Sequence, residues 1–442
     1  MNKTNINLIP DTKNPSPDYY CTWQTQLYAT CDGKPVKQRE CITERALFGD
    51  EKPFGWADFY KEARQDLLLV MDDSWDVPLN GDPSYYGSLL LNSEKFPEAT
   101  DNAASNTEAL KRLTSRIKAL GWKGLGGWVC AQESEKAGNI SSAEEYWRKK
   151  LREAHASGFA YWKVDWGKKG EDIEFRKMLT RLGKQYAPNL VIEHALINNV
   201  ISYGDVFRTY DVPAIMSIPM TMTKLADIFS QRRPQETGMG LIDCEDEAYI
   251  AAAGGFSMGI MRHPYVGKFI NGVPDMSFPE IHRNLKSKMY EVLRAVHWHR
   301  IAPAFGVSEG TVTISGDKLC DYWRFEDKAE EIEEWWLQVP FFKECITEDM
   351  VKICAPGQIS RNCIPATVYA DEKGNIPFII ASQNPNGAFS VAALGRTLGR
   401  EYKIPACRVE INTQRSDIIG VFGDYKELVI KTDLKDIRSV YM

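Results

Sequence analysis

The sequence lacks the features that mark several classes of protein. No uninterrupted apolar run approaches the roughly 18 residues of a membrane span, so no transmembrane helix is expected. The 54 basic and 60 acidic residues give a net charge of −6 and form no basic block, which argues against nucleic acid and anionic membranes as partners. The N-terminus has no apolar signal-peptide core. We therefore expect a cytoplasmic protein, or a periplasmic or secreted one if a signal peptide has been removed.

Motifs for metals, cofactors and serine nucleophiles are also missing. None of the 10 cysteines forms a C-x-x-C pair, which argues against a zinc ribbon or a thioredoxin-like site. Free thiols are the simplest interpretation, although Cys21, Cys31 and Cys41 could pair in an oxidising compartment. With only 6 histidines, no G-x-S-x-G and no G-x-G-x-x-G, a catalytic serine triad and a dinucleotide site are poorly supported. No cofactor and no bound metal are expected.

What the chain does contain, up to about residue 305, is an alternation of strand-like and helix-like segments. The predicted strands are Cys21–Gln26, Leu67–Met71, Gly124–Cys130, Ala160–Val164, Leu190–Glu193, Val206–Thr209, Met239–Ile242 and Phe256–Met261. The predicted helices are Gly55–Gln65, Asn106–Leu120, Ser142–Ser157, Ile173–Tyr186, Thr223–Gln231, Glu245–Ala253 and Pro279–His299. Eight strands with helices between them, over about 290 residues, predict a (β/α)8 TIM barrel over residues 1–305.

The pattern changes after Pro303. Short alternating runs such as Pro377–Ala381 and Phe389–Ala393 are separated by turn sequences such as Asn384-Pro385-Asn386-Gly387. Residues 306–442 are therefore predicted to form a C-terminal antiparallel β-sandwich domain.

Acidic residues follow several of the predicted strands. They are Asp72, Asp73, Asp165, Glu193, Asp211 and Asp243. Because the carboxyl ends of the strands of a (β/α)8 barrel meet on one face, these acids are expected to surround one pocket. So many carboxylates repel one another unless a cation, a metal ion or the hydroxyl groups of a ligand compensate their charge. The set therefore predicts a functional pocket, and the 12 Trp and 19 Tyr residues include flat faces that suit sugar rings.

Two carboxylates are the minimum equipment for cleaving a glycosidic bond. Lys163 and Asp165 are two residues apart on one strand, so both are expected to point into the barrel mouth, where the lysine would keep Asp165 ionised. Asp211 follows Phe207 and Tyr210, and partial burial there would raise its pKa toward that of a proton donor. Arg208 would oppose that shift.

The residues at the strand ends resemble motifs of one enzyme group. Asp72-Asp73-Ser74-Trp75 resembles the D-D-x-W motif of α-galactosidases and related melibiase-like enzymes, and Lys163-Val164-Asp165 resembles their K-x-D nucleophile motif. The segment from Gly204 to Asp211 is similar to the one that carries their acid/base aspartate. Arg208 and Asp211 are three residues apart, where four is common in that group, so Asp205 stays open as an alternative acid.

The resemblance implies a retaining α-glycosidase that acts through a covalent glycosyl-aspartate. Asp165 would be the nucleophile and Asp211 the acid/base. The substrate-binding residues expected with them are Asp72, Asp73, Trp75, Trp128, Lys163, Glu193, His194, Arg208 and Asp243. The partner is a carbohydrate, and an α-galactoside, a β-L-arabinopyranoside or another sugar fits the pattern.

Two other functions stay open. A metal-dependent barrel lyase or isomerase of sugars or sugar acids would bind Mg²⁺ through Asp165, Glu193 and Asp211 or Asp243, with Lys163 as base. A barrel that binds carbohydrate without catalysis would keep its ligand when Asp165 is replaced. Neither the oligomeric state nor the natural leaving group can be read from the sequence.

Overall fold

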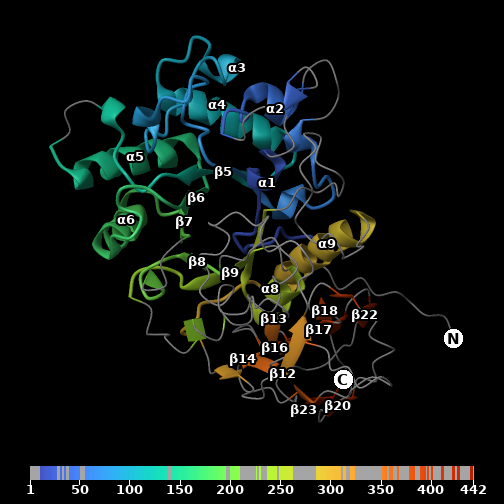
Figure 1. Ribbon diagram of the computed structural model, residues 1–442. Helices are drawn as coiled ribbons and strands as arrows, with labels where there is room; N and C mark the ends of the chain where they lie inside the picture. Colours follow the sequence, from blue (N-terminus) through green and yellow to red (C-terminus); the bar gives the residue numbers. More distant parts are fainter. Residues whose placement is uncertain are drawn as a thin grey trace.

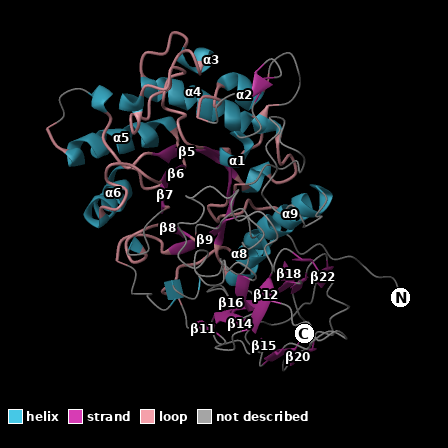
Figure 2. Cartoon of the chain, viewed as in Figure 1, coloured by secondary structure: helices cyan, strands magenta, loops and turns pink. Residues whose placement is uncertain are grey.

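Eight parallel strands form a closed barrel in the computed structural model, with helices around it (Figures 1 and 2). In barrel order they are β1 (Tyr19–Cys21), β4 (Leu68–Met71), β5 (Gly124–Val129), β6 (Tyr161–Val164), β7 (Val191–His194), β8 (Val206–Arg208), β9 (Leu241–Glu245) and β10 (Ser257–Ile260). The order follows the chain, and β1 pairs with β10 to close the ring. The predicted (β/α)8 barrel is thus confirmed.

The structure describes most of the barrel and part of the region that follows it. Up to residue 309 it covers residues 10–309 apart from 27–29, 32–33, 36–38, 50–54, 138–140, 196–199, 210–224, 226–227, 230–235, 246–247 and 262–284. Beyond residue 309 it describes the backbone of 13 strands: β11 (Val312–Ile314), β12 (Leu319–Trp323), β13 (Val351–Ala355), β14 (Gln358–Arg361), β15 (Ala366–Thr367), β16 (Phe378–Gln383), β17 (Phe389–Leu394), β18 (Arg396–Thr397), β19 (Arg400–Glu401), β20 (Glu410–Asn412), β21 (Val421–Gly423), β22 (Lys426–Leu428) and β23 (Ser439–Tyr441).

The helices lie between the barrel strands, as the alternation predicts. They are α1 (Trp23–Gln26), α2 (Glu44–Phe48), α3 (Pro97–Thr100), α4 (Asn106–Ala119), α5 (Ala143–Ser157), α6 (Ile173–Tyr186), α8 (Ala248–Gly254) and α9 (Leu285–Ile301). Short 3-10 helices cover Trp56–Asp58, Arg64–Asp66, Pro83–Tyr85 and Glu135–Ala137, and β2 (Thr30–Cys31) and β3 (Lys34–Pro35) form a hairpin. Among the helices of the described part, none is long and apolar enough to cross a membrane.

Local sequence explains where α5 and α6 begin and end. The Ser142 hydroxyl accepts a hydrogen bond from the Glu145 N–H, and the Asp172 carboxylate does the same for Phe175 at the start of α6. Gly158, at a φ of 72°, ends α5 in the left-handed conformation that glycine adopts without strain. On α6, Gly183 has no side chain to hold the helix away from Ile192 of β7. These signals fix two of the helices that flank β6.

Three predicted segments differ from the structure. The first strand lies at Tyr19–Cys21, and the residues predicted to continue it form the single turn α1, in which the Gln26 N–H donates to the Thr22 carbonyl. The predicted helix Gly55–Gln65 is instead a pair of 3-10 turns. Glu245 is the last residue of β9, not the first of a helix. The predicted helix Thr223–Gln231 and residues 279–284 lie largely outside the described residues.

Side-chain alternation gives the barrel wall two faces. Inside, Tyr19, Val70, Tyr161, Val206 and Leu241 pack with neighbours into a small apolar cluster. The residues between them point outward and join the large core shared with the helices. The interior is therefore filled with side chains at its base, and a pocket can open only at the carboxyl end of the strands.

A buried aspartate closes the base of the barrel. The Asp18 carboxylate accepts hydrogen bonds from the Met258 N–H at 2.9 Å and from the Asn14 side chain at 2.6 Å, and it lies 2.5 Å from Nδ1 of His299 on α9. One side chain thus joins the chain before β1 to β10 and to the last helix, where the β1–β10 pairing is only two residues long. Barrel closure depends on it.

The strands after the barrel do not form the purely antiparallel sheets that we predicted. The largest sheet has the order β11-β14-β16-β17-β21-β22; in it β14 pairs with β16 and β17 with β21 in parallel, and the other pairs are antiparallel. Side-chain alternation has the same period in both kinds of sheet, so it predicts strands without predicting their direction. The helix α8 packs against β16 (Phe378–Gln383) and β17 (Phe389–Leu394). A sandwich arrangement stays a prediction.

Replacing Asp18 by alanine should lower the free energy of unfolding by about 3–5 kcal/mol, because three buried groups lose their shared acceptor. The measurement is urea denaturation at neutral pH. Glu174→Ala is the control, since its side chain is 82% exposed and forms a surface ion pair with Lys177; it should cost no more than about 0.5 kcal/mol. Equal losses in the two variants would contradict this role of Asp18.

Candidate active site

The predicted acids meet at the carboxyl end of the barrel strands. Asp72 and Asp73 follow β4, Asp165 follows β6, and Glu193 lies in β7 next to Arg208 of β8. All the barrel pairs are parallel, so these residues share one end of the sheet. The mouth also includes Trp128 of β5, Lys163 of β6 and Glu245 of β9.

Asp165 is held by its backbone as well as by its side chain. Its N–H donates to the Val129 carbonyl at 3.0 Å, and its carbonyl accepts from Nη2 of the buried Arg176 at 2.8 Å. The Trp128 indole N–H donates to Oδ2 of Asp165 at 3.0 Å, while Nη2 of Arg208 lies 4.0 Å from Oδ1. The Asp165 side chain is 15% exposed, against 3% for Asp73 and 0% for Glu193. It is a fixed carboxylate that a ligand can reach.

The turn after Asp165 requires glycine. Gly167 has a φ of 151°, and a Cβ at this position would lie 2.7 Å from the Ala131 nitrogen. That nitrogen donates to the Trp166 carbonyl at 2.8 Å, so the chain folds back against the end of β5. A larger residue would displace the segment that carries Asp165.

Lys163 does not pair with Asp165 as we expected. Its ammonium lies 2.6 Å from Oδ2 of Asp72, and both groups are nearly fully buried. The Cys21 thiol also donates to Asp72 at 2.8 Å. Burial opposes the charged form of each group, yet the pair prevails: the pKa of Asp72 is lowered, chiefly by the Lys163 ammonium, and the pKa of Lys163 is raised, chiefly by Asp72. Both stay ionised, and Asp165 depends on other partners.

Asp73 has the opposite character. Burial raises its pKa to about 7, and the nearby charges of Asp72 and Asp165 add to this, against the lowering effects of Arg39 and of the Ser74 hydroxyl. The Ser74 hydroxyl donates to Oδ1 at 2.7 Å, and Nε of Arg39 lies 3.1 Å from Oδ2. Of the two adjacent acids, one is thus a permanent anion and the other can take up a proton near neutral pH.

Arg208 is the cation shared by the remaining acids. Its Nε lies 3.8 Å from Oε1 of Glu193 and 3.6 Å from Oε2 of Glu245, in addition to its contact with Asp165. Burial alone would lower the pKa of this guanidinium, but Glu245, Asp165 and Glu193 raise it well above its usual value. The sequence analysis missed Glu245. Glu245 could have been predicted from its two-residue spacing from Asp243, because this spacing places both side chains on the inner face of β9.

Glu193 and Asp243 lie deeper than Asp165. The Tyr161 hydroxyl donates to Oε2 of Glu193 at 2.5 Å, while Oε1 has no hydrogen-bond partner among the described residues. Asp243 is fully buried and accepts from the Ser257 hydroxyl at 3.1 Å, with the Tyr19 hydroxyl at 3.4 Å. Burial and the neighbouring acids, Glu193 first, raise the pKa of Asp243 well above its usual range. Asp243 therefore supports the floor of the site and does not line the mouth.

Two other predicted binding residues point away from the mouth. The His194 ring lies against α6, with Nε2 2.7 Å from the Thr180 hydroxyl, because it alternates with the inward-pointing Glu193. The Trp75 indole N–H donates to the Trp128 carbonyl at 2.7 Å, and its ring packs against Phe159 behind the barrel wall. Both predictions were wrong for the same reason: the end of a strand was identified, but the direction of the side chain was not.

The two candidate acids near β8 are separated by the structure. Asp205 precedes β8, and its carboxylate accepts from the Ile192 and Met239 N–H groups, both at 3.1 Å, at the amino end of the strands. It is therefore too far down the barrel to act at the mouth. Asp211 lies outside the described residues.

Basic side chains of the protein itself form ion pairs with the acids of the mouth. Lys163 neutralises Asp72, Arg208 serves the acids of β6, β7 and β9, and Arg39 pairs with Asp73. Within the described part of the chain, no group of three or more His, Cys, Asp or Glu residues has the arrangement of a metal site. The alternative of disulfides among Cys21, Cys31 and Cys41 fails at Cys21, whose thiol is free and buried.

No family model and no curated protein matches the chain, but solved structures do. One is a GH27 β-L-arabinopyranosidase from Geobacillus stearothermophilus, with 12% identity over 65% of this chain and 76% of that one and a TM-score of 0.42. Another is a putative α-galactosidase from Bacteroides fragilis, with 12% identity over 70% of each chain and a TM-score of 0.40. A third is a putative α-N-acetylgalactosaminidase from Bacillus halodurans, with 13% identity over 70% of this chain and 86% of that one and a TM-score of 0.39.

The raised pKa of Asp73 predicts a pH-dependent effect of Asp73→Asn. Between the ordinary value near 3.8 and about 7, the folded protein binds the Asp73 proton more tightly than the unfolded chain, so this group costs stability as the pH rises. Asparagine cannot ionise. The stability of the variant relative to the parent protein should therefore increase from about pH 4.5 to about pH 7 and then level off.

Urea denaturation at several pH values measures this difference. Asp82→Asn is the control, because hydrogen bonds from Ser84 hold the pKa of Asp82 below 3.8 and its effect should be flat over the same range. A flat difference for Asp73→Asn as well would show that Asp73 titrates normally.

Proposed function

We propose that the protein is a retaining α-glycosidase of the α-galactosidase type, with Asp165 as its nucleophile. The observation that carries this proposal is the setting of Asp165: a partly exposed carboxylate fixed by Trp128 and by its own backbone, 4.0 Å from a buried guanidinium. A carboxylate nucleophile has to be ionised and correctly oriented before it attacks an anomeric carbon. The Trp128 N–H and the Arg208 guanidinium orient the Asp165 carboxylate and limit its rotation.

The other mouth residues suit the binding of a sugar. Asp72 and Lys163 offer an acceptor and a donor side by side, which matches the hydroxyl groups of a pyranose ring. Oε1 of Glu193 lies 3.8 Å from Nε of Arg208 but accepts no hydrogen bond from the described residues, which supports a further contact with a hydroxyl group. Because Asp72 and Lys163 are buried and ionised, a substrate that leaves one of them unpaired binds poorly, which gives selectivity among sugars.

Asp211 serves as the acid/base in this proposal. A retaining enzyme needs a second carboxyl group about 5–5.5 Å from the nucleophile, on the other side of the scissile bond. Asp211 follows Arg208 by three residues, just beyond the end of β8. Asp205 lies at the amino end of the barrel, which favours Asp211 over it as the acid/base.

The metal-dependent alternative is weakened by the same ion pairs. The Mg²⁺ ligands it requires include Asp165 and Glu193, and Arg208 already lies within 4.0 Å of both. Catalysis by Lys163 as a base would also require a neutral amine, whereas Asp72 raises its pKa. Activity that survives EDTA is expected, and activity that EDTA abolishes would favour the alternative.

A panel of nitrophenyl glycosides identifies the activated aryl α-glycoside that the protein cleaves. On this substrate, Asp165→Asn and Asp165→Ala should lose at least about 10³-fold in kcat. Azide should restore part of the rate in the alanine variant, because a small anion fits the vacated position and attacks in place of the carboxylate. Asp172→Asn is the matched control, since it keeps the cap of α6 and lies outside the mouth. Full activity in Asp165→Asn would end the nucleophile assignment.

Asp211→Ala should lose activity according to the leaving group of the substrate. A missing general acid matters little when the leaving group departs as a stable anion, so a dinitrophenyl glycoside should lose less than about tenfold in kcat/KM. A glycoside with a poor leaving group should lose at least about 10³-fold. Equal losses on both substrates would point to another proton donor.

The C-terminal strands complete the proposal as a separate β-sandwich domain over residues 306–442. Their packing against α8, which joins β9 to β10, would stabilise the wall that carries Glu245.

A further inference from the structure

A buried arginine lies behind the turn that carries Asp165. It is Arg176 on α6, the helix beside β6 and β7 in Figure 1. Arg176 is fully buried, and its guanidinium donates to three backbone carbonyls: those of Gly170 at 2.8 Å, Val164 at 2.9 Å and Asp165 at 2.8 Å. These carbonyls lie before, at and after the nucleophile, so one side chain fixes the backbone on both sides of it.

His194 holds Arg176 in this orientation. Nη1 of Arg176 lies 3.4 Å from Nδ1 of His194, and Nε2 of His194 lies 2.7 Å from the Thr180 hydroxyl, one turn further along α6. A guanidinium only donates, so Nδ1 accepts and the ring proton is on Nε2. Burial, and after it the charge of Arg176, lowers the pKa of His194 well below its usual value, which keeps the ring neutral and able to accept.

The positive charge of Arg176 exceeds what the carbonyls require. A neutral donor satisfies a buried carbonyl, whereas a buried cation has a large desolvation cost. Burial lowers the pKa of Arg176 to about 10, and the strongest effect that opposes this is the negative charge of Asp165, followed by that of Glu171. The buried guanidinium is therefore compensated chiefly by the nucleophile whose backbone it holds.

Arg176 acts from behind the barrel wall. Its hydrogen bond to Asp165 goes to the backbone carbonyl, and its full burial keeps it out of reach of a sugar at the mouth. Any effect on the reaction must therefore pass through the position of the Asp165 carboxylate. Such an effect can be large, because a misplacement of about 1 Å in a reacting group can slow a reaction about 10²-fold.

We propose that Arg176 is a positioning residue for the nucleophile: its guanidinium, oriented by His194, holds the backbone of residues 164–170 so that the Asp165 carboxylate faces the anomeric carbon. This inference rests on the proposed glycosidase function and adds a residue that no motif of the sequence singled out. Because Arg176 acts on the nucleophile and not on the sugar, its loss lowers kcat and leaves the binding of the free sugar unchanged.

The main variant is Arg176→Lys, which keeps the charge but lacks the planar fork that reaches three carbonyls. On the nitrophenyl glycoside that the panel identifies, kcat should fall about 10²-fold. The inhibition constant of the free sugar should change less than about twofold, because the groups that bind its hydroxyls are untouched. His194→Phe keeps the guanidinium but removes the acceptor that orients it, and should lower kcat about tenfold with the same unchanged inhibition constant.

Azide separates positioning from general damage to the pocket. In Asp165→Ala, azide attacks in place of the carboxylate, so no nucleophilic side chain remains to be positioned. Adding Arg176→Lys to Asp165→Ala should therefore change the azide-rescued rate less than about twofold. If the azide-rescued rate falls as far as kcat falls in Arg176→Lys alone, the arginine supports the whole pocket and the proposal is overturned.

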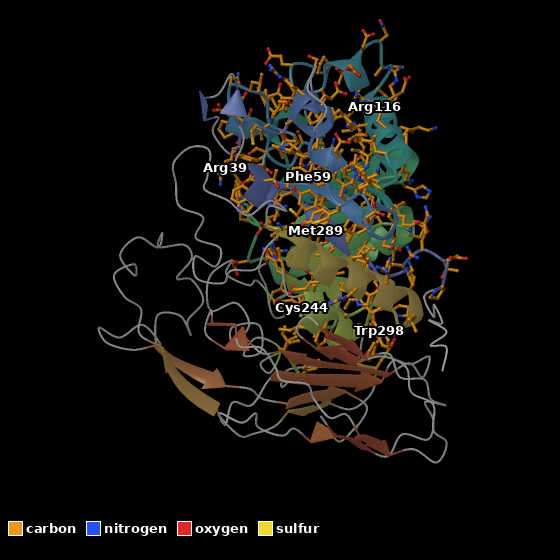
Figure 3. All side chains as sticks on the ribbon, turned by 90° about the vertical axis from the view of Figure 1, so that its right-hand side faces the viewer. Arg39, Phe59, Arg116, Cys244, Met289 and Trp298 are labelled. Atoms are coloured by element: carbon orange, nitrogen blue, oxygen red, sulfur yellow. The ribbon has the colours of Figure 1, made fainter. Side chains whose placement is uncertain are left out.

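Arg64→Lys is the matched control. Arg64 also donates to three backbone carbonyls, but it lies in the 3-10 helix before β4, at the amino end of the barrel; the carbonyls are those of Asp58, Leu120 and Phe59, the last of which is labelled in Figure 3. Urea denaturation should show that both lysine variants lose stability, whereas kcat in Arg64→Lys should change less than about twofold.

The outcomes separate this inference from the proposed function. Full kcat in Arg176→Lys, or an equal loss of kcat in Arg64→Lys, would overturn the positioning role while the effect of Asp165→Asn still supports a glycosidase. If the parent protein cleaves no glycoside of the panel, the proposed function fails and the positioning role fails with it.

Discussion

Burying two cations among five acids is the constraint on which the active end of the barrel depends. Lys163 and Arg208 are almost inaccessible to water, and isolated charges at such depth are costly. The negative charge of Asp72 compensates that of Lys163, whereas Arg208 is shared by acids from three strands. The pairing leaves the acids with different properties, because each has a different distance from a cation and from water.

That difference separates the roles of chemically identical groups. The pKa of Asp72 is lowered by Lys163, burial raises the pKa of Asp73 to about 7, and burial raises the pKa of Asp243, below them, well above its usual range. Asp165 combines partial exposure with an indole donor and a neighbouring guanidinium. A ring of equivalent carboxylates would have no preferred nucleophile, so the specialisation of Asp165 follows from the environments of its neighbours as much as from its own.

The sequence predicted the barrel and most of the residues at its mouth. Parallel strands buried on both sides read as short apolar runs, and an acid directly after such a run has to lie at the carboxyl end of the sheet. This reasoning identified Asp72, Asp73, Asp165 and Glu193 correctly as neighbours. It also predicted that Lys163 and Asp165 share a face, because alternation along one strand is a local property.

Contacts between strands could not be obtained in the same way. The partner of Lys163 proved to be Asp72, which lies two strands away in the barrel, and Arg39 reaches Asp73 from a turn between β1 and β4 that is distant in sequence. Trp75 and His194 stand at strand ends but point behind the wall. The direction of strand pairing after residue 309 was also missed. What the sequence determined by itself is therefore the periodicity of the elements and the order of the chemical groups along them. What only the tertiary structure decided is which charges meet, because ion pairing and burial depend on distances that the closure of the barrel creates.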